Sequence, residues 1–232
     1  MNFAGNFIRI GEVDPAQLRA LALEICEDDW NTDVFRQRRY EVHRDTQTVG
    51  LVFDLDFRHS HPTRLPMLQK FEPALRPVLK MVADHFEESE KGRKLTEQFG
   101  LGYFIRATLV RLKAGGSIAP HTDNNFSLVH SHRVHVPITT NKDVSFTVGN
   151  ETINMQPGDV IEINNRRMHS VSNGGDDDRI HLILDFVVPG EQCCCGAKRH
   201  PDLLCSPQAC RDTDHLQIPC TCILEEIGRA HV

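Results

Sequence analysis

The sequence predicts a mainly β fold with flanking helices, and two observations predict it. Strand-like runs with alternating apolar residues recur through residues 103–186. Tight turns separate them, most clearly Gln156-Pro157-Gly158-Asp159 before the strand 160–163. Short strands joined by tight turns are typical of a double-stranded β-helix, or jelly roll, so we place that fold at 101–190.

Length and composition limit the number of domains and the kinds of partner that the chain can have. The 232 residues, 40% of them hydrophobic, supply one sizeable core rather than two. We expect a single domain over 1–190, in which residues 1–100 form helices and strands that flank the jelly-roll core. The net charge of −6 gives no basic field, so no nucleic-acid partner is expected. We find neither an N-terminal targeting segment nor an apolar run long enough for a membrane span, which predicts a cytoplasmic protein.

The N-terminal part begins with a helix and continues with strands. Asp14 is a candidate N-cap before Pro15, and an apolar stripe at helical spacing follows. That stripe is Leu18, Leu21, Ala22 and Ile25. Strands are predicted within 39–57, where apolar residues alternate from Val49. His43 and Gln47 lie at the beginning of this region, and a solvated loop is the ordinary interpretation of either residue.

A long apolar repeat at helical spacing covers 66–86. Pro73 and Pro77 interrupt it, which predicts one kinked helix or two short ones behind the barrel. Residues 87–98 are rich in mixed charges and predict a surface helix or loop.

Two strands of the barrel have faces of opposite character. On 132–139, Arg133 and His135 alternate with Val134, Val136 and Ile138; on 179–186, Arg179 and His181 alternate with four apolar residues. We predict that the cationic faces line a pocket for an anionic ligand. The alternative is a solvated outer face, with the arginines paired to the acidic run 176–178.

A metal site is predicted from three residues. His121 and Asp123 are two apart, so at a strand end both side chains leave one face, after a turn shaped by Gly115-Gly116 and Pro120. His169 completes two histidines and one carboxylate, a set that suits non-haem Fe(II) oxygenases. A His-x-Asp pair also arises by chance. A closed zinc site is disfavoured, because no cysteine lies between these residues.

Several motifs together resemble the aspartyl/asparaginyl β-hydroxylase family, specifically over Tyr103 to Pro189. They are Ala119-Pro-His-Thr-Asp123, His132-Arg-Val-His-Val-Pro137, Gly149-Asn-Glu-Thr152, Pro157-Gly-Asp159, His169-Ser-Val171 and Arg179-Ile-His-Leu-Ile-Leu-Asp185. The resemblance implies a cupin-like jelly roll and a dioxygenase (hydroxylase) that uses Fe(II), 2-oxoglutarate and dioxygen. His121, Asp123 and His169 would be its metal ligands and catalytic centre, although some family members have glycine at the position of Asp123.

The resemblance also implies a site for 2-oxoglutarate. A guanidinium suits the far carboxylate of this cosubstrate because it bonds in a bidentate way. Arg179 follows His169 by the interval seen in the family, and Thr108 would add a hydroxyl donor. Arg133 and His135 match positions that hold the metal-proximal carboxylate, and binding of substrate is the alternative for both. Related enzymes also present polar side chains from the region of His43 and Gln47 toward the substrate.

The substrate stays open between a free amino acid, an amino acid on a carrier protein, and an Asp or Asn residue of a peptide. A non-catalytic cupin-like protein that binds metal and a small acid is the alternative function. A cupin-type isomerase or dioxygenase is a weaker one, because such proteins usually have more histidines around the metal.

Residues 191–232 form a cysteine-rich tail that contains seven of the eight cysteines. Their spacing lacks the paired Cys-x-x-Cys motifs of a zinc module. We keep three interpretations of this tail: a disordered segment, a metal site, or a sequencing artefact in which a frame error precedes an adapter-like end at 226–232.

Overall fold

The computed structural model describes residues 3, 5–32, 43–54, 62–123, 126–129 and 131–191. The tail from 192 onward lies outside the described residues, as do 33–42 and 55–61, which include 39–42 and 55–57 of the region in which strands were predicted. No prediction about the tail cysteines is therefore tested.

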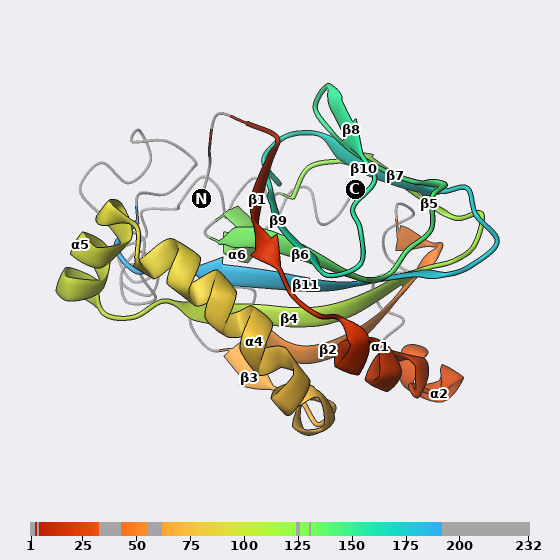
Figure 1. The fold of residues 1–232 in the computed structure, drawn as a ribbon, viewed down its shortest axis with the longest axis horizontal. Helices are drawn as coiled ribbons and strands as arrows, with labels where there is room; N and C mark the ends of the chain where they lie inside the picture. Colours follow the sequence, from red (N-terminus) through yellow and green to blue (C-terminus); the bar gives the residue numbers. More distant parts are fainter. Residues whose placement is uncertain are drawn as a thin grey trace, which may run out of the picture.

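The strands of the described residues form two antiparallel sheets (Figure 1). The seven-stranded sheet has the order β1-β9-β6-β11-β4-β2-β3, and the four-stranded sheet has the order β5-β10-β7-β8. The large sheet consists of β1 (Phe7–Glu12), β2 (Thr46–Asp54), β3 (Pro62–Arg64), β4 (Tyr103–Leu112), β6 (His132–Thr139), β9 (Asp159–Ile163) and β11 (Arg179–Val187). The small one consists of β5 (Ser117–His121), β7 (Val144–Val148), β8 (Glu151–Ile153) and β10 (His169–Asn173). The predicted mainly β jelly roll is confirmed.

Helices pack on the outer face of the large sheet. Those that contact its strands are α1 (Ala16–Leu23), α2 (Glu27–Trp30) and α4 (Leu68–Glu87). Helix α5 (Glu90–Phe99) packs against α4, and α6 (Phe126–Val129) lies in the loop after β5. Helix α4 crosses the large sheet in Figure 1. It is one continuous helix despite Pro73 and Pro77. Each proline costs about 3 kcal/mol, but α4 buries seven residues, of which Phe71, Leu75 and Val82 are 0% exposed. Each large apolar side chain among them contributes about 1.5–3 kcal/mol. Burial therefore outweighs the prolines.

Strands β6 and β11 have one apolar face and one polar face, as predicted. The apolar residues of β6 and β11 join α1 and α4 in one core, which includes Val134, Val136, Leu182 and Leu184. The opposite faces point into the barrel, where Arg133 is 9% and Arg179 is 1% exposed. The alternative of a solvated outer face with arginines paired to 176–178 is wrong, because both side chains are buried and their partners are Asp123 and Asp185 for Arg133 and His181 for Arg179.

One local prediction needs correction. Pro120 lies inside strand β5 rather than in the turn before it. The turn comes earlier, where Gly115 has a φ of 67°. Proline is tolerated in β5 because this strand is at the edge of the four-stranded sheet, where one row of backbone N–H groups needs no ladder partner.

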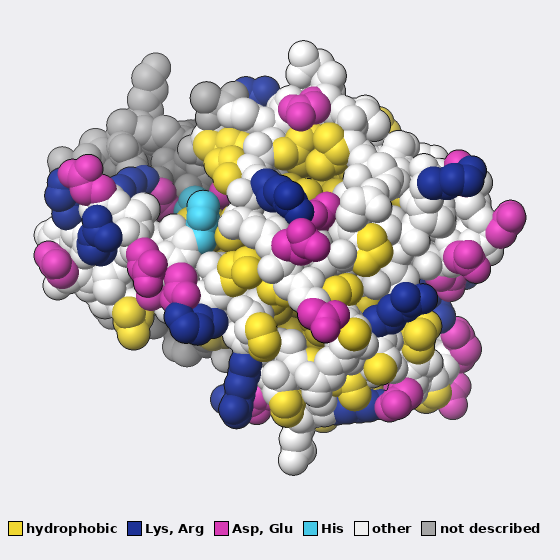
Figure 2. Space-filling model, viewed as in Figure 1, with side chains coloured by type: hydrophobic (Ala, Val, Ile, Leu, Met, Phe, Trp, Pro, Cys, Tyr) yellow, Lys and Arg dark blue, Asp and Glu magenta, His cyan; other side chains and the backbone are white. Residues whose placement is uncertain are grey.

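The surface carries both signs of charge. On the face drawn in Figure 2, lysine and arginine side chains are interspersed with acidic ones, and hydrophobic side chains are exposed in scattered places between them. Within the described residues, none of the helices combines the length and the apolar character that a membrane crossing requires.

A buried charge cluster fixes the end of the described chain. The ring nitrogens of His132 lie 2.6 Å from Glu162 Oε1 and 2.7 Å from Glu191 Oε2. Lys91 Nζ on α5 lies 2.5 Å from the other Glu191 oxygen. Burial raises the pKa of Glu191, but the hydrogen bonds from His132 and Lys91 outweigh it, so the pKa ends well below its ordinary value.

Glu191→Gln should lower the free energy of unfolding at neutral pH by on the order of 3 kcal/mol, because it breaks a buried ion pair. A carboxylate with a depressed pKa stabilises the fold above its unfolded pKa, and this contribution is lost as the pH falls. The difference between wild type and variant should therefore shrink below about pH 4.5. Thermal unfolding of both proteins from pH 7 to pH 3 measures it, and a difference that is constant over this range would contradict the assignment.

Candidate active site

Strands β5 and β10 bring the three predicted metal ligands together. They pair in antiparallel fashion with His121 opposite His169, and the two imidazole centroids are 4.3 Å apart. Asp123 follows β5 by two residues. One ligand atom from each of the three residues lies within 4.8 Å of the others. Small side-chain rotations bring such atoms to one ion, so the predicted cluster exists as a spatial unit.

Hydrogen bonds orient both histidines for metal binding. His121 Nδ1 lies 2.8 Å from the carbonyl of Ala119, and His169 Nδ1 lies 3.0 Å from the carbonyl of Arg167. A carbonyl only accepts, so each Nδ1 is the protonated donor and Nε2 is the nitrogen that each ring can offer to a metal. Burial, and then the neighbouring His169, lower the pKa of His121. Both effects favour the neutral imidazole that a metal requires.

The carboxylate of Asp123 is also held in place. Arg133 Nη1 donates to Asp123 Oδ2 at 2.7 Å, while its Nε and Nη2 donate to Asp185 at 2.8 and 2.9 Å. The backbone N–H of Asp123 donates to the carbonyl of Asn165, and Arg166 Nη1 donates to the Asp123 carbonyl. A two-histidine, one-carboxylate set with such support fits an octahedral ferrous ion that keeps open positions.

Arg179 lies in a different environment from Arg133. Its Nη2 donates to Nδ1 of His181 at 2.6 Å, and its Cζ lies 5.8 Å from the centroid of the Phe146 ring. In the described part of the chain no carboxylate pairs with it, and burial lowers the pKa of Arg179 to about 9. It is still charged at neutral pH, so within the described residues this buried cation has no carboxylate partner.

His135 lies next to His181, the partner of Arg179. Its Nδ1 is 3.4 Å from Nδ1 of His181. Burial, then Arg179 and Arg133, keep the pKa of His135 well below its ordinary value. Within the described residues, His135 Nε2, His181 Nε2 and Arg179 Nε are buried polar atoms without a hydrogen-bond partner. Buried polar atoms are normally satisfied, so these three fit the polar groups of a small anionic ligand such as 2-oxoglutarate.

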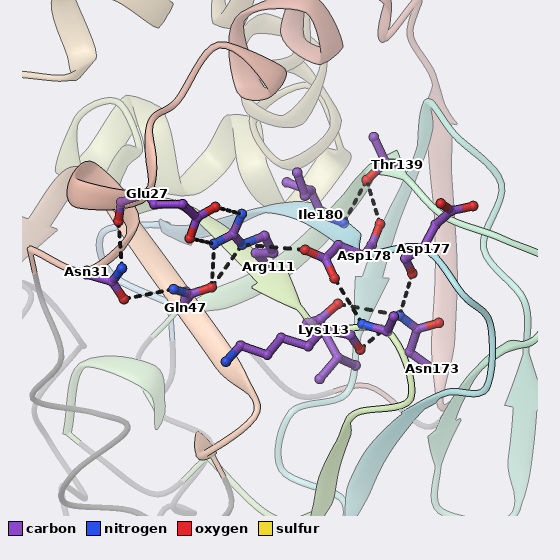
Figure 3. Close-up of polar contacts among 12 residues, drawn as sticks. Glu27, Asn31, Gln47, Arg111, Lys113, Thr139, Asn173, Asp177, Asp178 and Ile180 are labelled. Atoms are coloured by element: carbon purple, nitrogen blue, oxygen red, sulfur yellow. Dashed lines mark hydrogen bonds and ion pairs between the residues drawn. The ribbon is translucent and has the colours of Figure 1, made fainter.

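A polar network fixes the loop that leads into Arg179 (Figure 3). Asn173 Nδ2 donates to the carbonyls of Asp177 at 2.9 Å and Lys113 at 3.1 Å. Thr139 Oγ1 donates to the carbonyl of Asp178 and accepts from the N–H of Ile180 at 2.9 Å. The residues on either side of Arg179 are therefore anchored to neighbouring strands, which limits the positions that its guanidinium can take.

The structure places the remaining predicted site residues, His43, Thr108 and Gln47, in different surroundings. His43 lies at the metal cluster, with its ring centroid 5.6 Å from that of His121. Thr108 is buried on β4, in register with Ile183 of β11. Gln47, in contrast, accepts from Arg111 at 2.9 Å and donates to Asn31 at 2.9 Å. Figure 3 shows it in a network with Glu27 and Arg111 that attaches α2 to the sheet.

Sequence reasoning missed the roles of Asp185 and Arg166. Asp185 shares the inward face of β11 with Arg179 and His181, because the three are separated by even numbers of residues. This alternation in the sequence could have indicated that Asp185 belongs to the site. Arg166 had none, because its contact with Asp123 depends on how the β9–β10 loop folds.

Comparisons with known proteins agree with the motifs. Residues 91–189 match the family model described as Aspartyl/Asparaginyl beta-hydroxylase. A comparison with curated proteins finds no match. Among solved structures, the chain is similar to an oxidoreductase of the 2OG-Fe(II) oxygenase family from Burkholderia pseudomallei, at 15% identity and a TM-score of 0.48, covering 74% of this chain and 77% of that one.

Two further solved structures are similar to parts of the chain. The viral collagen prolyl hydroxylase vCPH from Paramecium Bursaria Chlorella virus-1 has 9% identity and a TM-score of 0.46, covering 79% of this chain and 96% of its own. A cupin domain from Bordetella pertussis has 20% identity and a TM-score of 0.29, covering 35% and 79%. The resemblance predicted from the motifs is confirmed by the family model: residues 91–189 of this chain match the aspartyl/asparaginyl β-hydroxylase family.

Proposed function

We propose that this protein is an Fe(II)- and 2-oxoglutarate-dependent dioxygenase that hydroxylates an amino acid, or an Asp- or Asn-type residue in a peptide or on a carrier. One observation carries the proposal. The His121, Asp123 and His169 cluster shares a barrel with the buried cation Arg179, which has no carboxylate partner in the described chain. Metal binding alone does not require such a cation, but a dicarboxylate cosubstrate does.

Each residue has a defined task in this proposal. His121 and His169 offer neutral Nε2 atoms, and Asp123 offers a carboxylate that Arg133 orients. Iron bound there, with 2-oxoglutarate and dioxygen, would supply the oxidant for hydroxylation of a C–H bond. Arg179 would bind the far carboxylate of the cosubstrate, and Thr108 and His135 would line its site. His43, beside His121, is the described residue best placed to face a substrate.

Succinate release tests the proposal directly. Anaerobically iron-loaded protein is mixed with 2-oxoglutarate and oxygen, with and without amino acids, their carrier-bound forms and short Asp- or Asn-containing peptides. We expect substrate-stimulated succinate release and a product heavier by one oxygen atom. A non-catalytic binding protein would instead bind iron and 2-oxoglutarate but release no succinate with any substrate, and that outcome would reject the proposed activity.

A further inference from the structure

The partner of Arg179 is unusual among the buried arginines of this barrel. Arg133 and Arg106 both pair with carboxylates, those of Asp185 and Asp54. Arg179 instead donates to the imidazole of His181 at 2.6 Å. Asp185 and His181 lie on the same inward face of β11, so this one strand supplies a charged partner to Arg133 and an uncharged one to Arg179.

The hydrogen bond determines the state of His181. A guanidinium has only donors, so Nδ1 of His181 must accept and its proton must lie on Nε2. The ring is therefore neutral. Burial, then Arg179 and His135, lower the pKa of His181 in the same direction. His181 is 1% exposed, and its Nε2 and the Nε of Arg179 have no partner among the described residues.

A neutral acceptor and a carboxylate at this position would have opposite effects on ligand binding. A carboxylate would form an internal ion pair with Arg179, and an incoming anion would then have to break that pair. An imidazole orients the guanidinium through one N–H and leaves its charge uncompensated. The other donors of Arg179, together with His181 Nε2–H, stay available to an anion.

We propose that His181 is a positioning residue that holds Arg179 through a neutral hydrogen bond and so keeps its charge available for the far carboxylate of the cosubstrate. This inference rests on the proposed function. In this proposal residues 179 and 181 together, rather than Arg179 alone, determine how tightly the site binds a dicarboxylate.

The variants His181→Asn and His181→Asp test this assignment, because they have the same shape and differ in charge. Both can place an oxygen near the position of Nδ1. His181→Asn should change the half-saturating 2-oxoglutarate concentration by no more than about fivefold, the worth of one neutral hydrogen bond. His181→Asp should raise it at least about thirtyfold, because the ion pair must be broken. Without cosubstrate, the Asp variant should have a higher Tm than the Asn variant.

The readout is the Tm shift of the anaerobic Fe(II)-loaded protein as 2-oxoglutarate is added, which needs no turnover. Ser172→Asp adds the same charge on an exposed position of β10 and should behave as wild type. The pair His181→Gln and His181→Glu repeats the comparison if the shorter side chains prevent folding. A wild type that 2-oxoglutarate does not stabilise rejects the proposed function itself. A wild type that responds, with acid and amide variants that respond equally, rejects the role of His181.

Discussion

Arg179→Ala is expected to raise the 2-oxoglutarate concentration needed for succinate formation by roughly thirty- to several-thousand-fold, the loss that follows when one partner of a buried charge pair is removed. His181 is neutral and cannot replace the charge. Arg179→Lys keeps the charge but loses the bidentate geometry, so a smaller loss in the same direction is expected. Iron affinity should hardly change, because Arg179 makes no contact with the three metal ligands in the described residues. Succinate release at varied 2-oxoglutarate, with an anaerobic Fe(II) titration, measures both quantities.

The same residue should affect stability in the opposite direction. A buried cation destabilises the cosubstrate-free fold when no carboxylate pairs with it, as is the case for Arg179 within the described ranges. Arg179→Met, which preserves much of the volume, should therefore raise the Tm of that state while it weakens cosubstrate binding. Arg111→Met is the matched control. Arg111 pairs with Glu27 at 2.6 and 2.7 Å outside the barrel, so its loss should lower the Tm and leave the 2-oxoglutarate dependence unchanged. If Arg179→Ala binds 2-oxoglutarate as wild type does, the cosubstrate assignment fails and Arg133 becomes the next candidate.

The strands of the barrel could be predicted because each buries one face in a helix-covered core and the other in a polar interior. Alternation on 132–139 and 179–186 is a direct consequence, and β6 and β11 begin at the predicted residues, His132 and Arg179. The continuous helix α4 was ambiguous, because propensity counts against the prolines and only tertiary burial decides the outcome.

Only those site residues could be predicted whose own side-chain chemistry indicates a function. His121, Asp123 and His169 were identified by their ligand types, and the register of β5 against β10 brings them together. The pairing of Arg133 with Asp185 depends on the register of β6 against β11, which a single sequence does not specify. Strand alternation alone did not distinguish Arg133 from Arg179. In the described part of the chain their partners do, because Arg133 donates to Asp123 and Asp185, whereas Arg179 donates to His181.

His121→Ala and His169→Ala are each expected to abolish tight Fe(II) binding and 2-oxoglutarate turnover. Loss of a residue that merely orients a metal ligand costs about 10- to 100-fold in affinity, so loss of one of only three ligands should cost more than about 100-fold. Anaerobic Fe(II) titration measures the affinity, and succinate release measures the turnover. His85→Ala is a suitable control, because His85 is exposed on α4 and contacts Phe86. Iron affinity like that of wild type in both ligand variants would reject the metal site.

Asp123→Gly should be milder than either histidine change, which makes it the more informative variant. Some members of the resembling family have glycine at this position, and both histidines would still be oriented by the carbonyls of Ala119 and Arg167. Arg133 would lose one carboxylate but keep its two hydrogen bonds to Asp185, so the barrel should stay folded. We expect weakened iron binding that a higher Fe(II) concentration restores. If the variant binds no iron at any Fe(II) concentration, iron binding at this site depends on all three ligands. The contact between Arg133 and Asp123 would then be needed for iron binding, because it orients a carboxylate that the metal cannot do without.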